Sequence, residues 1–211
     1  MKLKFLVSAC CLLLTFVAWA MTDADAILLK LQKKYESIRD ASVTFTQIVR
    51  FGVTNAEQSF TGKLLMKKEK KYRLELEQQT IVTDGKSVWS FSKLNNQILI
   101  DKYKEDPRSF TPDRVLVNVP NEYNSVMMGS EKLKDRETTI VKLIPKNTAS
   151  NIKWMKVWVD TDDWLMKKIQ VFDISDNLMT YFVEDLKLNS GLADSTFQFD
   201  IPPDVEVIDL R

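Results

Sequence analysis

The feature that most constrains the fold is a period of two in the apolar residues, which begins at Ala41 and continues through most of the chain. Apolar and polar side chains alternate through 60–67 and again through 72–77, as in strands with one buried face. Asp84-Gly85 stands between two apolar runs and is the strongest hairpin signal in the sequence. The sequence therefore predicts antiparallel strands joined by short turns.

Further runs rich in β-branched and aromatic residues predict the later strands. These runs are 97–101, 138–144, 152–159, 165–172, 179–188 and 205–208. Acidic and small residues at 160–163 and 173–177 predict the turns between the later strands. Because a twisted sheet of about ten strands does not stay flat, we expect it to curl.

A curled sheet has an inner face, and apolar side chains on that face line a cavity if no second sheet fills it. Tyr72, Leu74, Trp89 and Phe91 are candidates for such a lining. On the residues alone, ordinary core packing explains these four side chains at least as well.

One amphipathic segment precedes the strands. Apolar residues at spacings of three and four form one helical stripe, made of Ala24, Leu28, Leu31, Tyr35 and Ile38. Thr22-x-x-Asp25 supplies a capping box at its start. The pattern predicts a single N-terminal helix that packs on the sheet.

The segment 105–125 interrupts the strand pattern and contains three prolines. Thr111-Pro112-Asp113 is typical of the start of a short helix, with a cap, a proline at the first helical position and an acid in the first turn. A long interruption of this kind can form a flap over one face of a sheet or an ordinary surface connection. The sequence leaves both interpretations open.

The first twenty residues have the composition of a secretory signal peptide. A short basic start is followed by the apolar run 5–19 and by the small-x-small triplet Ala18-Trp19-Ala20. We therefore expect a signal peptide at 1–20 and a single domain at 21–211, with a second cleavage point after Ala26 as the alternative. Both cysteines lie in this segment, and the residues before Cys10 resemble a lipobox, which leaves lipidation of Cys10 as a less favoured alternative.

Composition limits the chemistry of the chain. Thirty basic and 29 acidic residues leave no excess charge that would favour nucleic acid as a partner, and the sequence contains no histidine. Ser-His-Asp and Cys-His catalysis, imidazole switches and histidine-based zinc sites are thereby excluded. We expect no enzymatic activity, no metal and no cofactor.

Two charged clusters have a functional and a plain interpretation. Asp160, Asp162 and Asp163 could attract a hard cation, but the glycine and distal glutamate of a calcium loop are missing, so a solvated turn is favoured. Lys67, Lys68, Lys70 and Lys71 flank a predicted hairpin tip. These lysines either keep a solvent-exposed turn soluble or make an electrostatic contact with a lipid head group or an acidic partner.

Four segments, in order along nearly the whole predicted domain, resemble the outer-membrane lipoprotein carrier protein (LolA) family. They are ASVTFTQ at 41–47, the strand pair at 62–73, TDGKSVW at 83–89 and FQFDIPPDVEV at 197–207. The resemblance implies a mainly β protein with few helices. Its fold would be an unclosed antiparallel β-barrel of about eleven strands, with an N-terminal helix and a helical lid around an apolar cavity.

The resemblance also implies site residues. The lipid-binding cavity would be lined by Leu64, Met66, Tyr72, Leu74, Trp89 and Phe91, and the lid would contain Phe110, Val115, Leu116 and Val117. In the family an arginine followed by a proline holds the lid closed, whereas this chain has Lys68 and Glu69 at the matching positions. Lys68 is therefore the candidate latch, although lysine lacks the planar fork of donors that arginine offers.

The implied function is that of a periplasmic chaperone that carries acylated lipoproteins from the inner to the outer membrane. Its implied partners are these lipoproteins, an inner-membrane lipoprotein-releasing ABC transporter and an outer-membrane receptor, and it would act as a monomer. Two other classes remain open. One is a periplasmic sensor or regulatory module of similar fold that binds lipid or peptide. The other is a hydrolase built on two paired carboxylates, for which the sequence marks no pair.

Overall fold

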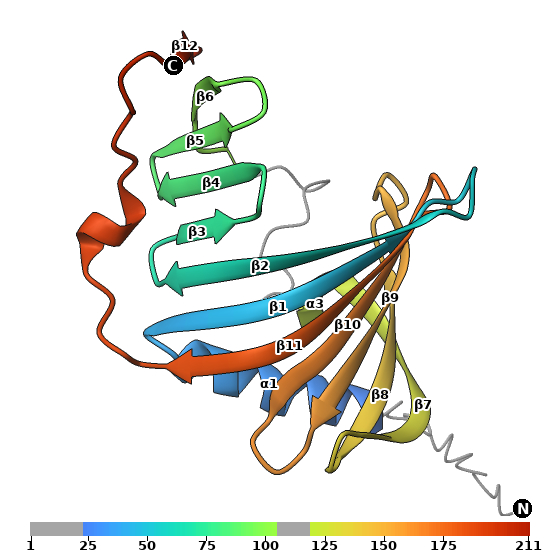
Figure 1. Ribbon diagram of the computed structural model, residues 1–211. Helices are drawn as coiled ribbons and strands as arrows, with labels where there is room; N and C mark the ends of the chain where they lie inside the picture. Colours follow the sequence, from blue (N-terminus) through green and yellow to red (C-terminus); the bar gives the residue numbers. More distant parts are fainter. Residues whose placement is uncertain (1–22, 105–118) are drawn as a thin grey trace, which may run out of the picture.

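The computed structural model describes residues 23–104 and 119–211. In these residues the chain forms one sheet together with a few short helices (Figure 1). The strands are β1 (Asp40–Arg50), β2 (Glu57–Lys67), β3 (Lys71–Glu75), β4 (Gln79–Asp84), β5 (Ser87–Ser92), β6 (Gln97–Lys102), β7 (Tyr123–Leu133), β8 (Arg136–Pro145), β9 (Ile152–Asp160), β10 (Leu165–Asp173), β11 (Leu178–Leu188) and β12 (Glu206–Asp209). The helices are α1 (Asp23–Ser37), α3 (Val119–Glu122) and the 3-10 turn η1 (Asp194–Phe197).

The strand order in the sheet is β12-β6-β5-β4-β3-β2-β1-β11-β10-β9-β8-β7. Neighbours pair antiparallel, except that β12 pairs parallel with β6. Since β12 and β7 stand at opposite ends of this order, the sheet stays unclosed in the part of the chain that is described. The expected open antiparallel sheet of about eleven strands is confirmed, and the short C-terminal strand adds a twelfth.

Helix α1 packs on one face of the later strands. Ala24, Leu28 and Leu31 are buried against side chains of β8, β9 and β10, which include Val141 and Val157. The 3.6-residue stripe in the sequence therefore correctly identified the buried side of the helix. We call the side of the sheet that carries α1 the inner face, and the opposite side the outer face.

Strand β7 was not expected from the sequence. Its pairing with β8 shifts between Met127 and Ser130, and Gly129 in that stretch has a φ of +98°. Such a bulge breaks the alternation of apolar residues, which is the signal that sequence reasoning depends on. The predicted interruption therefore ends earlier than expected, at the start of β7.

The segment after β11 passes alongside β2–β5 (Figure 1). Its residues 195–202 share a hollow with side chains of β2–β5 such as Arg73, Thr80 and Phe91. The Asp40 carboxylate anchors its start by accepting hydrogen bonds from the N–H groups of Ser190 (2.8 Å) and Gly191 (3.2 Å). Farther along, Phe197 of η1 is fully buried. Among the helices within 23–104 and 119–211, none combines the length and the apolar character that a membrane crossing requires.

Candidate functional site

The register of the strands decides which predicted site residues share a face. Leu64 pairs with Val43 of β1 and with Leu74 of β3, and directly paired residues of antiparallel strands project to the same side. Two residues on along each strand, Met66 pairs with Tyr72. On β1, Val43 and Gln47 face the same side, and Gln47 pairs with Tyr181 of β11, which packs against the cluster around α1. The side chains of Leu64, Met66, Tyr72 and Leu74 therefore lie on the inner face.

This inner face continues beyond the four predicted residues. Leu74 pairs with Ile81, and Tyr72 pairs with Thr83, which in turn pairs with Val88. Most of these apolar side chains are half-buried. We call the set the inner wall, and it consists of Phe60, Leu64, Met66, Tyr72, Leu74, Ile81, Val88 and Leu99.

Two members of the inner wall are notably accessible for large apolar residues. Phe60 is 36% exposed and Leu99 is 38% exposed. Sequence reasoning missed both, together with Ile81 and Val88. For Ile81 and Val88 the reason is that each is followed directly by another apolar residue, Val82 or Trp89, so the alternation does not tell which face they occupy. The pairing partners supply that information.

A close contact between β1 and β2 separates the inner wall from the helix-covered half of the face. A Cβ at Gly62 would lie 2.4 Å from the Cζ atom of Phe45, so only glycine leaves room for this ring. The Phe45 ring is 6.0 Å from that of Tyr181, whose hydroxyl accepts a hydrogen bond from Gln47 Nε2 at 3.1 Å. Burial raises the pKa of Tyr181 to about 12. The phenol is therefore neutral at neutral pH, and this junction adds no charge to the apolar surface.

Trp89 and Phe91 do not share the inner wall. Trp89 pairs with Val82 and Ile100, and Phe91 pairs with Thr80 and Ile98, all of which project to the outer face. The Phe91 ring lies 5.6 Å from the ring of Phe199 in the C-terminal segment. The register therefore divides the six predicted lining residues into four on the inner face and two on the outer face, where Phe91 lies beside the C-terminal segment.

The outer face carries a hollow of about 530 Å³ between β2–β5 and residues 195–202. Its walls are mixed, because Arg73, Glu75, Lys93 and Asp200 stand among aromatic and small polar residues. Arg73 Nε lies 2.6 Å from Glu75 Oε1, so the guanidinium already has a carboxylate partner. This hollow is lined by two cationic and two anionic side chains, which interrupt its apolar surface.

The lysines at the β2–β3 turn serve the C-terminal segment. Lys67 Nζ donates to Leu192 O (2.9 Å) and to Asp194 Oδ1 (2.7 Å), and this hydrogen bond lowers the pKa of Asp194. Lys71 Nζ lies 2.9 Å from Glu69 Oε2. Two of the four lysines in the basic cluster thus hold neighbouring parts of this chain.

The candidate latch lies beside these contacts. The Lys68 side chain is exposed, and its backbone N–H donates to Arg39 O at 3.1 Å. The predicted lid residues Phe110, Val115, Leu116 and Val117 lie outside the described residues. The role of Lys68 as a latch therefore remains a prediction.

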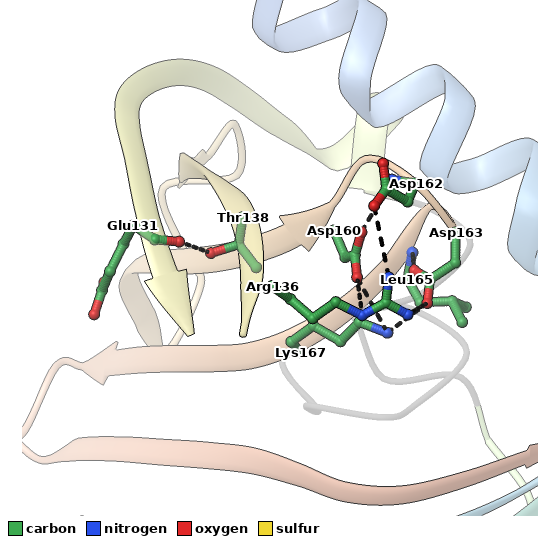
Figure 2. Close-up of polar contacts among 8 residues, drawn as sticks. All are labelled: Glu131, Arg136, Thr138, Asp160, Asp162, Asp163, Leu165 and Lys167. Atoms are coloured by element: carbon green, nitrogen blue, oxygen red, sulfur yellow. Dashed lines mark hydrogen bonds and ion pairs between the residues drawn. The ribbon is translucent and has the colours of Figure 1, made fainter. Parts of the chain in front are cut away.

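The aspartates after β9 form a turn network (Figure 2). Asp160 is 1% exposed, and its Oδ2 lies 3.3 Å from Arg136 Nε and 3.7 Å from Lys167 Nζ. Lys167 also contacts Asp163 Oδ2 at 2.6 Å, while Asp160 Oδ1 accepts the N–H of Asp162. Within 23–104 and 119–211, no group of three or more acidic, histidine or cysteine side chains could hold a metal ion. The two cations give this cluster a structural role in the turn.

Comparisons with known proteins agree with the geometry of the sheet. The model of the family described as outer membrane lipoprotein carrier protein LolA matches residues 36–200. An outer-membrane lipoprotein carrier protein of Haemophilus ducreyi is 24% identical over 195 residues, which cover 91% of this chain and 89% of the relative.

Two further relatives are less informative about function. An uncharacterized protein of Methanocaldococcus jannaschii is 25% identical over 185 residues, or 86% of this chain, which spans about half (52%) of that relative's length. The crystal structure of an uncharacterized conserved protein from Thermus thermophilus has a TM-score of 0.60 at 13% identity, and the match covers 89% of this chain and 99% of the other. That likeness shows the fold alone. Since the family model covers most of the chain, this protein belongs to the LolA family.

Proposed function

We propose that this protein is a periplasmic carrier that binds the acyl chains of lipoproteins against the inner wall. The observation that supports this most is a continuous set of half-buried apolar side chains on the face that α1 leaves uncovered. Contiguous apolar side chains that remain accessible mark binding surfaces in soluble proteins. Membership of the LolA family and the name of the H. ducreyi relative support the choice of lipoproteins as ligand.

The energetics of acyl chains explain why a carrier needs such a wall. Each methylene that leaves water gains about 0.8 kcal/mol, so one chain of ~14 methylenes would cost on the order of 11 kcal/mol to leave exposed. A wall of apolar side chains compensates this cost and keeps the lipid removable. The Asp101 carboxylate, which the register places beside Val88, lies 3.8 Å from Lys104 Nζ. Leu64, Leu74 and Ile81 offer aliphatic contacts in adjacent positions on three successive strands.

The proposal includes the partners and the compartment that the family resemblance implies. An inner-membrane lipoprotein-releasing ABC transporter would load the carrier, and an outer-membrane receptor would unload it. Export by the segment 1–20 would place the domain in the periplasm, where it would act as a monomer without cofactor or enzymatic activity. The lid and the latch at Lys68 would control release.

Site-specific photocrosslinking tests the choice of face. A photoreactive amino acid at Leu74, on the inner wall, should crosslink to a triacylated lipoprotein that has been released from inner-membrane vesicles. The matched control is the same amino acid at Phe91, which lies two strands away on the outer face. We expect crosslinks from position 74 and background from position 91.

The other outcomes of the same experiment are informative. Crosslinks from position 91 alone would contradict the inner wall as the acyl-binding surface. Equal crosslinking of an unacylated peptide from position 74 would contradict the carrier role and favour the sensor module that the sequence left open.

A further inference from the structure

A second surface lies on the outer face of β8–β11, on the side of the sheet opposite α1 (Figure 1). Trp154 of β9 and Phe172 of β10 stack with ring centroids 5.2 Å apart and an interplanar angle of 24°. Neither ring is buried. Ile144, near the end of β8, adds an aliphatic side chain that is 40% exposed.

Lysines cover these rings. The Nζ atoms of Lys142 and Lys156 lie 5.6 Å and 5.3 Å from the centroid of the Trp154 ring. These two lysines are direct pairing partners on the neighbouring strands β8 and β9. Lys168 Nζ lies 4.1 Å from the ring of Trp158 and 5.5 Å from that of Phe182. We call this set the lysine–aromatic face, and it consists of Lys142, Trp154, Lys156, Lys168, Phe172 and Phe182.

The charge on this face is unbalanced. Lys142, Lys156 and Lys168 have no carboxylate partner among the described residues, whereas Lys153 beside them pairs with Asp176 at 2.5 Å. Three acids border the face. Arg136 and Lys167 neutralise Asp160, Lys134 pairs with Glu184, and Glu131 of β7 accepts the Trp158 Nε1–H. Since the whole chain has a net charge of +1, this excess of positive charge is local.

We propose that the lysine–aromatic face docks on the surface of a bilayer that contains anionic phospholipid. Lysines place their charge in the head-group layer while their stems lie along apolar surface. Tryptophan is enriched at the same depth, because its ring is apolar and its N–H is polar. An acidic protein would also pair with the lysines, but lysines spread over a half-buried Trp–Phe stack match the adjoining head-group and acyl layers of a bilayer.

This proposal goes beyond lipoprotein binding and does not depend on it. The inner wall and the lysine–aromatic face occupy opposite sides of the sheet, so a carrier could lie on a membrane by one surface while the other remains available to cargo. The interaction should be weak and sensitive to salt, because exposed charges are screened over about 10 Å at 0.1 M salt.

Vesicle binding by the chain from Met21 onward, without cargo, tests the proposal. At low salt we expect binding to phosphatidylcholine vesicles that contain phosphatidylglycerol, and little binding to phosphatidylcholine alone. Each lysine near an anionic surface contributes roughly five-fold, so the triple variant K142Q/K156Q/K168Q should bind about 100-fold more weakly. The control K33Q/K63Q/K93Q removes the same charge from exposed lysines elsewhere and should lose less than about five-fold.

Fluorescence quenching locates the contact. Brominated lipid in the anionic vesicles should quench Trp154, so W154F should lose most of the quenching while W89F keeps it. Matching thermal unfolding curves would show that all variants remain folded. Absence of binding to anionic vesicles, equal losses in the two triple variants, or binding only to an acidic protein would overturn the proposal. None of these results would bear on acyl binding at the inner wall, because no lipoprotein is present.

Discussion

The two halves of the inner face are built from similar apolar residues but differ in how deeply these residues are buried. In the half formed by β8–β10, side chains such as Val141 and Val157 are fully buried beneath α1. In the half formed by β2–β5, Leu64 and Leu74 are only half-buried. The difference is the helix, because the 15 residues of α1 cover one half of the sheet only. The comparison teaches that the same alternating pattern becomes a buried core or an accessible apolar wall according to what covers it.

The largest expected effect comes from truncating the helix that fills the first half. Leu28→Ala should lower the free energy of unfolding by about 2–5 kcal/mol, because it removes a side chain that is 1% exposed and leaves a cavity. Leu74→Ala on the inner wall should cost less than about 1.5 kcal/mol. Urea denaturation of both variants measures the difference. Equal losses would mean that the inner wall is core and would contradict the comparison.

The second prediction concerns binding at the inner wall. Tyr72→Glu should weaken acyl binding by roughly 2–4 kcal/mol, because it places a charge against the lipid. The protein should still fold, because this side chain is half-exposed. Displacement of a fluorescent fatty acid measures the affinity, and Arg73→Glu, one position along on the outer face, is the matched control. Normal binding by the Tyr72 variant would show that the wall is not used.

The third prediction tests the point where both halves and the C-terminal segment meet. Burial would raise the pKa of Asp40, but hydrogen bonds from the Ser190 hydroxyl and from the N–H groups of 190–192 lower it below the usual range. The stabilisation by the ionised carboxylate is therefore present above the unfolded-state pKa and is lost as the pH falls through the folded-state value.

Asp40→Asn should consequently cost about 1–2 kcal/mol at pH 7, and the cost should shrink below about pH 4. Chemical denaturation at several pH values measures this difference between wild type and variant. A cost that stays constant down to pH 2 would show that the effect comes from packing and not from ionisation.

The smallest expected effect on stability is at the candidate latch. Because the Lys68 side chain is exposed, Lys68→Leu should change the free energy of unfolding by less than about 0.5 kcal/mol. If Lys68 holds the lid, the same variant should nevertheless increase the labelling rate of a cysteine placed at Val115 and slow the transfer of cargo to an acceptor. Lys68→Arg should have the opposite effects. Unchanged labelling and transfer in both variants would remove the latch hypothesis.

Local signals in the sequence predicted the elements that depend on local physics. The stripe of Ala24, Leu28 and Leu31 located the helix face, and Asp84-Gly85 located a hairpin in which the Asp84 carboxylate accepts the N–H groups of Lys86 and Ser87. The open sheet and the inner positions of Leu64 and Leu74 agree with the family resemblance.

The features that the sequence did not predict depend on pairing between distant strands. The alternation of apolar and polar residues does not encode this pairing. In β5, Val88 and Trp89 are adjacent and both apolar, although Val88 faces the inner wall and Trp89 faces the outer side of the sheet. The pattern therefore could not assign Trp89 to a face. Similarly, the shift between Met127 and Ser130 hid strand β7, although its flanks are ordinary strand sequence.

The pairing of β1 with β11 at the middle of the sheet also governs how the chain can reach this structure. Asp40 and Ser190, which bond at this junction, are 150 residues apart in the sequence. Closing so long a loop costs entropy before any contact repays it, so folding should be slow compared with that of helical domains. Strand β1 can pair with β2 early, but its other edge stays open until β11 arrives. Until then the central strand can pair with another chain, and this edge is where aggregation of the newly made protein should begin.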